Sequence, residues 1–226
     1  MTEDQDFEKQ SEIMVRQQIA RRGILDQRLL DAMRRVPRHI FVPQGQQKWA
    51  YDDGAQRIGM GQTISQPYIV ALMTQALKLK GTEKVLEVGT GSGYQAAILG
   101  YLAAEVHTIE RHAQLAKDAG AILQQQGLTN VQVHIGDGSL GLPKQAPYQG
   151  ILVTAAAPVV PKPLLEQLDE GGRLVLPVGE KFSQVLQVWQ RQGAGYTHKI
   201  ITAVAFVPLI GEEGWDEDLW NQSESR

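Results

Sequence analysis

The feature that most constrains this chain is a largely apolar run, residues 85–88, that passes directly into three alternating glycines, Gly89, Gly91 and Gly93. A helical mixture of Ala, Ile, Leu and Gln follows over 94–102. A buried strand that turns sharply into a helix needs this pattern, because glycine supplies the turn's backbone angles and lets a ligand approach the main chain. The helix start adds unpaired N–H groups and a positive dipole end. The segment therefore predicts a site for a nucleotide-type cofactor.

The spacing of the glycines distinguishes between two kinds of cofactor. The dinucleotide fingerprint Gly-x-Gly-x-x-Gly needs its third glycine where this chain has Tyr94, which makes a nicotinamide enzyme the least favoured interpretation. Here an acidic residue, Glu87, stands in the strand just before the glycines. The resulting form, Glu-x-Gly-x-Gly-x-Gly, resembles the first motif of the S-adenosylmethionine-dependent methyltransferases.

Two later strand ends support this resemblance. Residues 105–109 predict a strand with Glu110 at its carboxyl end, about 20 positions after the glycines, where a carboxylate grips a ribose diol. The alternative role for Glu110 is a cap on the following helix. Residues 131–135 predict a third strand that ends in Asp137 between two glycines. Asp137 could be a turn residue, but in methyltransferases an acidic or polar residue here binds the adenine amino group.

Strands that alternate with helices along the chain predict an α/β fold. We expect a doubly wound, mostly parallel seven-stranded methyltransferase sheet with a C-terminal antiparallel hairpin and an N-terminal helical extension. The remaining strands are expected at 151–153, 173–178, 185–189 and 200–207, with the hairpin turn at 192–195. The helices are expected at 7–22 (ended by Gly23), from Asp26 to the stop at Pro37, at 66–79 and at 161–168, with an irregular loop at 38–61 and a turn at Gly171-Gly172.

Composition narrows the class of protein further. The formal net charge is −3 with no dense Lys/Arg cluster, which argues against a nucleic-acid partner. The absence of cysteine excludes disulfides, thiol nucleophiles and the usual Cys-based zinc sites, and we expect no metal site. The N-terminus is acidic and polar rather than a secretory leader, and no apolar run is long enough to span a bilayer. We therefore expect a monomeric cytoplasmic protein with no membrane partner.

The chain is expected to form one compact domain in three parts. Residues 1–61 supply helices and a loop packed on the core, 62–215 form the methyltransferase domain, and 216–226 form a polar tail. A length of 226 residues suits one good core with an appendage.

The segment after the fourth strand indicates what the site does not bind. It reads Thr154, three alanines and Pro158. Amino-methylating enzymes of this class commonly place Asn or Asp, two prolines and an aromatic residue here to hold a planar NH₂ group. Three alanines offer no such clamp, but they leave room for something as wide as a peptide backbone. The alternative is tight packing between strand and helix, which alanine also serves.

No obvious general base accompanies these residues. His107 and His134 lie within predicted strands, where a lone histidine is more often a core residue than a catalyst, and His39, His112 and His198 have no recognisable partner. An acceptor that is already an anion needs no base, because a carboxylate is deprotonated at neutral pH. This pattern favours methylation of a carboxyl group.

A second loop precedes the helix expected at 66–79. Ser65 is placed as the N-cap of that helix, with Pro67 tolerated in its first turn. A hydroxyl and free N–H groups at a helix start form a ready anion site. The loop is therefore suited to orienting a carboxylate acceptor.

Several segments together resemble the protein-L-isoaspartate O-methyltransferases, in order from about Met14 to Trp215. The glycine loop is common to all such methyltransferases, whereas the serine loop and the alanine segment are specific to this family. The resemblance implies methyl transfer from S-adenosyl-L-methionine to the free α-carboxylate of L-isoaspartyl and, more weakly, D-aspartyl residues in damaged proteins or peptides, which initiates repair through a succinimide. The matching segments are 62–67, 85–95, 153–158, 171–175 and 206–209.

The resemblance also implies roles for individual residues. Ser65 is assigned to the active site, and the acceptor is expected to contact Ser65 and the alanine segment at Thr154, Ala155 and Ala156. The methionine end of the donor is expected at Gly89 and Gly91, its ribose at Glu110, and its adenine at Asp137 and Gly138. The remaining residues expected to bind the donor are Thr63, Ile64, Glu87 and Ser92.

Two other functions remain open at this point. A small-molecule O-methyltransferase of the same fold should show a His or Lys base, or an Asp-rich metal site, near the fourth strand, and the sequence shows none there. A module that binds the cofactor or a peptide without chemistry is disfavoured by the intact serine loop, but only an assay excludes it.

Overall fold

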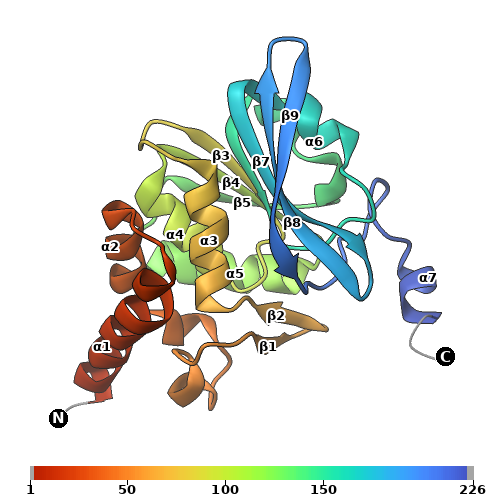
Figure 1. The fold of residues 1–226 in the computed structure, drawn as a ribbon. Coiled ribbons are helices and arrows are strands. Elements are labelled where there is room, and N and C mark those ends of the chain that lie inside the picture. Colours follow the sequence, from red (N-terminus) through yellow and green to blue (C-terminus); the bar gives the residue numbers. More distant parts are fainter. Residues whose placement is uncertain (1–2, 223–226) are drawn as a thin grey trace.

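The computed structural model describes residues 3–222, so residues 223–226 of the expected polar tail lie outside the described residues. Its centre is a seven-stranded sheet in the order β5-β4-β3-β6-β7-β8-β9. β5, β4, β3, β6 and β7 are mutually parallel, whereas β8 and β9 run antiparallel at one edge (Figure 1). The strands are β3 (Lys84–Val88), β4 (Glu105–Glu110), β5 (Val131–Ile135), β6 (Tyr148–Val153), β7 (Leu168–Glu180), β8 (Ser183–Gln192) and β9 (Gly195–Val204).

This architecture confirms the predicted fold class. The chain runs outward from β3 through β4 to β5, then returns to add β6 on the other side of β3. The strand order therefore reverses between β3 and β6, which in open α/β sheets is where ligands bind. The helices that connect or flank the strands are α3 (Pro67–Leu77), α4 (Tyr94–Leu102), α5 (Ala113–Gln125) and the short α6 (Lys162–Glu166).

Both faces of the sheet are buried, and the alternation of side chains along each strand divides the core. Val85 of β3 packs in a cluster with Met73 and Leu77 of α3, whereas its neighbour Leu86 packs in a second cluster with Leu164 of α6. Burial on both sides explains why the parallel strands read as nearly continuous apolar runs in the sequence.

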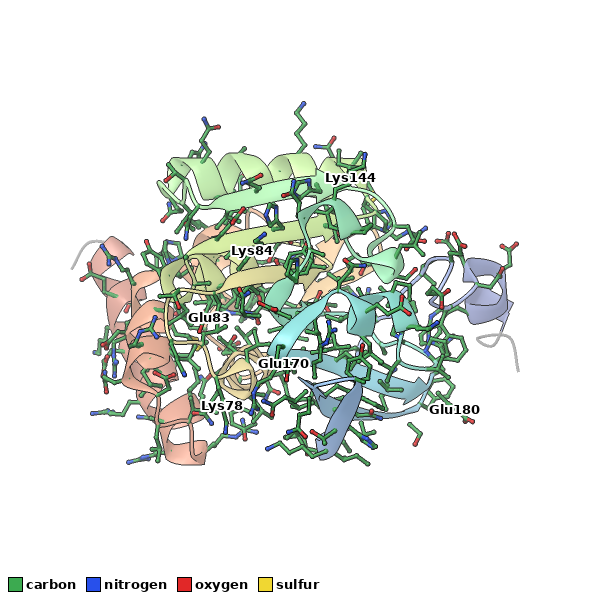
Figure 2. All side chains as sticks on the ribbon, turned by 90° about the horizontal axis from the view of Figure 1, so that it is seen from above. Lys78, Glu83, Lys84, Lys144, Glu170 and Glu180 are labelled. Carbon is green, nitrogen blue, oxygen red and sulfur yellow. The ribbon has the colours of Figure 1, made fainter. Side chains whose placement is uncertain are left out.

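The amino end of β3 is anchored by the two charged residues at its start, Glu83 and Lys84, which Figure 2 labels. The Glu83 carboxylate accepts hydrogen bonds from the backbone N–H groups of residues 80–82 at 2.8–3.0 Å. The Lys84 Nζ donates to the carbonyl of Gln145 at 2.9 Å. These contacts fix the strand whose opposite end carries the glycine loop.

The N-terminal helices pack on the sheet's helical layer rather than standing apart. α1 (Glu3–Ile13) continues through a π-helical stretch, Met14–Ile19, into a 3₁₀ turn that ends at Gly23. The π stretch departs from the expected regular helix; its i→i+5 bonding brings the buried Met14 and Ile19 onto one face. The buried residues of this segment join those of α3 and α4 in one core cluster.

The second N-terminal helix, α2 (Gln27–Arg35), follows the sequence closely. The Asp26 carboxylate accepts hydrogen bonds from the N–H groups of Arg28 and Leu29 at 3.0 and 3.3 Å, so the expected N-cap is confirmed. The helix stops before Pro37, as expected.

Three expectations about loops and turns are corrected. Within the expected irregular loop, 3₁₀ turns at Arg38–Phe41 and Gln47–Trp49 precede a hairpin of β1 (Gln56–Gly59) and β2 (Gln62–Ile64). The hairpin turns through residues 59–61, all with positive φ. The expected turn at Gly171-Gly172 instead lies inside β7, where its register against β6 shifts. β9 ends at Val204 rather than 207, because the chain there leaves the sheet.

The two ends of the described chain lie at opposite ends of the molecule in both views (Figures 1 and 2). Within the expected tail, Glu217–Gln222 form helix α7. Glu217 pairs with Arg111, which follows β4, at 2.7 Å. Within residues 3–222 no helix is long and apolar enough to cross a membrane.

Candidate active site

A pocket with about 860 Å³ of empty space, partly open to solvent, lies at the carboxyl ends of β3, β4 and β6. The structure brings most of the expected site residues into its wall, namely Thr63, Ile64, Ser65, Glu87, Gly89, Gly91, Ser92, Glu110, Gly138, Thr154 and Ala155. Asp137 and Ala156 do not line it.

The glycine loop follows β3 and is tied to the segment after β6. Gly89 has a φ of 94°, in the left-handed region that favours glycine. The Thr154 hydroxyl donates to the Gly89 carbonyl at 2.6 Å, and a Cβ on Gly89 would collide with that hydroxyl oxygen. Glycine at this position therefore allows the turn and the contact between the two loops at once.

Glu110, at the end of β4, also holds the glycine loop. Its Oε2 accepts a hydrogen bond from the Gly91 N–H at 2.9 Å, and its Oε1 accepts one from the His112 N–H at 3.0 Å. The second bond goes to the N–H of His112, the N-cap residue of α5, and this helix has no side-chain cap, so the alternative in which Glu110 caps the helix does not hold. Glu110 as a whole residue is 6% exposed and lines the pocket.

Glu87, one of the residues expected to bind the donor, lines the pocket as a buried acid. Its side chain is fully buried in β3, and neither carboxyl oxygen has a hydrogen-bond partner. Burial, as the largest cause, and the nearby charge of Glu110 together raise the pKa of this carboxyl to about 8, against an opposing contribution from the Thr108 side chain. An orphaned buried carboxyl that lines a pocket fits a ligand with cationic groups, and S-adenosylmethionine carries a sulfonium and an ammonium.

The serine loop enters the pocket from the hairpin side, with Thr63 and Ile64 on β2 and Ser65 just beyond it. The expected capping role of Ser65 is wrong. The N-cap of α3 is Gln66, without a side-chain cap, and Pro67 takes the first helical position. Proline has no backbone N–H, so one of the N–H groups that a capping side chain would otherwise accept from is absent at this helix start. The helix therefore begins without the serine hydroxyl. The Ser65 side chain is therefore not engaged in capping this helix.

Of the two residues expected to bind adenine after β5, one lines the pocket and the other does not. Gly138 lines the pocket, and a Cβ there would lie 2.5 Å from Val88 Cγ1. The Asp137 carboxylate instead accepts hydrogen bonds from the Ser139 N–H and hydroxyl, at 2.9 and 2.7 Å, and from the Glu212 N–H at 2.8 Å. Asp137 thereby fastens the C-terminal segment beside the pocket.

That C-terminal segment supplies wall residues that sequence reasoning missed as site residues. Ala156 exchanges backbone hydrogen bonds of 2.8 Å with Val207 and Leu209, which brings 207–210 against the pocket. Ala156 and Ala157 are 0% exposed, so the alternative of tight packing holds for both. The run 206–209 was visible in the sequence, but nothing local indicated that it returns to the rim.

The histidines are mostly remote from the pocket. His107 and His134 bond to each other at 3.0 Å outside it. Two of the three histidines expected to lack a partner have one: His39 accepts or donates a hydrogen bond with the Tyr51 hydroxyl, and His198 stacks on Trp189. His112 lines the pocket beside Glu110, and its Nε2 is buried without a partner.

Few ionisable side chains line the pocket. The ionisable residues that line the pocket are Glu87, Tyr94, Glu110, Arg111 and His112. In the part of the chain that the structure describes, no group of three or more His, Cys, Asp or Glu side chains is placed to hold a metal ion.

The sheet order, the glycine loop and the acidic residues around it define the class: the chain is an S-adenosylmethionine-dependent methyltransferase of the doubly wound fold. The family model described as protein-L-isoaspartate(D-aspartate) O-methyltransferase (PCMT) matches residues 8–214. The chain therefore belongs to the protein-L-isoaspartate(D-aspartate) O-methyltransferase family.

Individual relatives agree with this membership. The chain is 51% identical over 210 residues to protein-L-isoaspartate O-methyltransferase 1 of Syntrophobacter fumaroxidans, covering 93% of this chain and 98% of the relative. It is 55% identical to the protein-L-isoaspartate O-methyltransferase of Methanoregula boonei, covering 90% and 94%. A solved protein-L-isoaspartate O-methyltransferase superposes with a TM-score of 0.81 at 25% identity, covering 96% of this chain and 69% of that one.

A second solved structure shows the same fold. It is a putative protein-L-isoaspartate O-methyltransferase from Plasmodium falciparum in complex with S-adenosyl-L-homocysteine, with a TM-score of 0.76 at 22% identity, covering 90% of this chain and 98% of that one.

Proposed function

We propose a division of the pocket into a donor end and an acceptor end for the activity that family membership gives this chain. The enzyme transfers a methyl group from S-adenosyl-L-methionine to the free α-carboxylate of L-isoaspartyl residues, and more weakly D-aspartyl residues, in damaged proteins or peptides, which initiates repair through a succinimide. The observation that carries the division is that Ser65, the glycine loop and Thr154 line one pocket.

The donor end is assigned to the loops after β3, β4 and β5. Gly89, Gly91 and Ser92 would hold the methionine portion, Glu110 the ribose and Gly138 the adenine, while the buried Glu87 offers a counter-charge for cationic groups. Asp137 remains assigned to the adenine side; it does not line the pocket but holds the loop that contains Gly138 through its bond to the Ser139 N–H. When bound, S-adenosylmethionine supplies a methyl group attached to a positively charged sulfur.

The acceptor end is assigned to Ser65 and to the segment after β6. The Ser65 hydroxyl would orient the carboxylate, while Thr63 and Ile64 position the serine loop against the donor end. Thr154 and Ala155 line the pocket, and Ala156 supports them from behind through its bonds to the C-terminal segment. Small side chains here leave space for the substrate's main chain.

No proton needs to be removed from this acceptor. A carboxylate is already ionised at neutral pH, so the residues around it need only exclude water and align its oxygen. His112 lies beside Glu110, on the strand β4 side that we assign to the donor, so it is not assigned as a base. Attraction between opposite charges strengthens as the pocket loses water.

Selectivity is proposed to follow from geometry. In an isoaspartyl linkage the main chain passes through the side-chain carbonyl, which leaves an α-carboxylate on a short arm. A normal aspartate carries its carboxylate one methylene further from the main chain. A misplacement of about 1 Å can cost about a hundredfold in rate, so a narrow pocket can discriminate between the two.

The same proposal covers the state of the protein. It acts as a monomer in the cytoplasm, with no membrane partner. It also has no nucleic-acid partner, which is supported by a net charge of −3 without a basic cluster. Residues 1–61 and 62–215 act as one compact domain, in support of which the stretch Met14–Ile19 and α2 share a core cluster with α3 and α4. Residues 216–226 are assigned as an appended tail, of which the structure describes 216–222; within that part, Glu217 of α7 pairs with Arg111.

The test is a pair of peptides that differ only in one linkage, isoaspartyl or aspartyl, offered with S-adenosylmethionine labelled in its methyl group. Base-labile label is expected only on the isoaspartyl peptide. Equal labelling of both, or label that resists base, would contradict the proposed function.

Replacing Ser65 with alanine is expected to lower kcat by at least about tenfold while changing donor affinity less than about twofold, because the hydroxyl contacts the acceptor end. Steady-state kinetics and calorimetry measure the two quantities. Ser92→Ala is the matched control: its hydroxyl oxygen accepts from the Tyr94 N–H at 3.3 Å within the glycine loop, so donor affinity should change more than kcat. The opposite pattern in both variants would reverse the two assignments.

Replacing Glu110 with alanine is expected to weaken donor binding by roughly 1–3 kcal/mol, because ribose hydroxyls and two loop N–H groups lose their acceptor. Calorimetric titration with S-adenosylhomocysteine measures the change. Glu105→Ala, at the other end of β4 where the carboxylate contacts His107, should leave the affinity unchanged. Unchanged affinity in Glu110→Ala would remove Glu110 from the site.

A further inference from the structure

Arg38 is a fully buried cation behind the acceptor end of the pocket. It opens the 3₁₀ turn Arg38–Phe41 and has 0% of its surface exposed. Its Nε donates to the carbonyl of Ala50 at 2.7 Å, and its Nη2 donates to the carbonyl of Ser65 at 2.8 Å. One guanidinium thus joins the N-terminal segment to the residue assigned to the acceptor.

No carboxylate balances this charge. Across residues 3–222 no ion pair includes Arg38, and its Nη1 has no hydrogen-bond partner. The guanidinium carbon lies 4.7 Å from the centroid of the Tyr94 ring. Burial raises the pKa of both Tyr94 and Tyr51, so the two phenols nearby are neutral at pH 7. A buried cation without an anionic partner is costly, which makes a functional reason for it worth testing.

Acidic groups lie at the donor end of the pocket: Glu110, and Glu87, whose raised pKa keeps it neutral at pH 7 in the free protein. Arg111 also lines this end, and it pairs with Glu217. Arg38 does not line the pocket, but it contacts the carbonyl of Ser65, the lining residue that we assign to the acceptor end. In a poorly solvated site an uncompensated charge acts on a ligand without direct contact.

We infer that Arg38 is a positioning residue that makes the acceptor end selective for an anionic group. It holds Ser65 in place through the serine carbonyl, and its unbalanced charge favours a carboxylate over a neutral group of the same shape. The inference rests on the proposed function, since it presumes that the acceptor is bound beside Ser65.

The test compares two peptides of the same sequence, one with the isoaspartyl α-carboxylate and one with the corresponding α-carboxamide, which is neutral and similar in shape. Binding of each is measured by calorimetry with S-adenosylhomocysteine present, so that no methyl transfer occurs. The wild-type protein is expected to prefer the carboxylate by about tenfold, and Arg38→Met should lose most of that preference. Arg38→Lys, which keeps the charge, should retain it.

A merely structural role would give a different result. Arg38→Met leaves the Ala50 and Ser65 carbonyls without their donor, so a displaced loop should weaken both peptides equally and keep their ratio. An unchanged ratio in Arg38→Met therefore overturns the inference. Binding of S-adenosylhomocysteine alone verifies that each variant is folded. If the wild-type protein does not methylate the isoaspartyl peptide, the proposed function fails instead.

Discussion

Replacing Gly89 with alanine is expected to reduce donor affinity by at least about a hundredfold and to lower the free energy of unfolding by about 2–4 kcal/mol. Two effects add. The φ of 94° is unfavourable for any residue with a Cβ, and that Cβ would collide with the Thr154 hydroxyl oxygen. The collision displaces the hydroxyl that bonds the Gly89 and Val88 carbonyls at 2.6 and 3.1 Å. Urea denaturation and calorimetric titration measure the two losses.

A control variant and a double variant test this explanation. Gly120→Ala lies within α5, where a Cβ would meet only Val133 Cγ2 at 3.9 Å, so it should stabilise the protein by roughly 0.5–1 kcal/mol. The double variant Gly89→Ala/Thr154→Ala removes the collision but not the backbone strain. Its loss of free energy of unfolding should therefore be smaller than the sum of the losses in Gly89→Ala and Thr154→Ala alone. Strict additivity would show that the collision contributes nothing.

The sequence predicts the glycine loop and its helix well, because the forces that shape them are local. Gly93 is the N-cap of α4 with a φ of 87°, and the helix runs from Tyr94 as expected. Likewise Asp26 caps α2 through bonds to the next few residues. The apolar runs that predict β3 and β4 follow from burial on both faces, which depends on composition rather than on a particular partner.

Features that depend on distant contacts could not be predicted in this way. The wall formed by 207–210 exists because Ala156 pairs with Val207 and Leu209, and no nearby residue indicates that pairing. The link from Arg38 to Ser65 joins residues 27 positions apart. Ser65 was misassigned because a serine shortly before a proline suits a cap, whereas Pro67 starts the helix one residue later than expected.

Glutamine in place of Glu87 is expected to remove a large part of the pH dependence of stability. The buried carboxyl has a pKa raised to about 8 by desolvation, against an ordinary value of 4.5. Between these values the unfolded chain has lost this proton and the native protein still holds it. The free energy of unfolding therefore falls as the pH rises through this window, by up to about 1.4 kcal/mol per pH unit, and no further above it.

Glu87→Gln has no proton to lose, so its free energy of unfolding should decline less steeply than that of the wild-type protein from pH 5 to pH 8. Urea denaturation at intervals of one pH unit measures both curves. Glu105→Gln, a partly exposed carboxylate on the neighbouring strand, serves as the control and should follow the wild-type curve. Parallel curves for Glu87→Gln and the wild type would contradict a protonated buried carboxyl.

The same ionisation should appear when the donor binds. A cationic ligand near Glu87 favours the charged carboxylate, so binding at pH 7 should release up to one proton per site in the wild-type protein. Calorimetry in buffers of different ionisation enthalpy counts that proton. Glu87→Gln should release none from this position and should bind the donor at least about tenfold more weakly, although it is the more stable protein near pH 8. The same buried carboxyl would then lower the stability of the protein and strengthen donor binding. Donor binding by the wild-type protein without proton release would show that ionisation of Glu87 does not accompany binding.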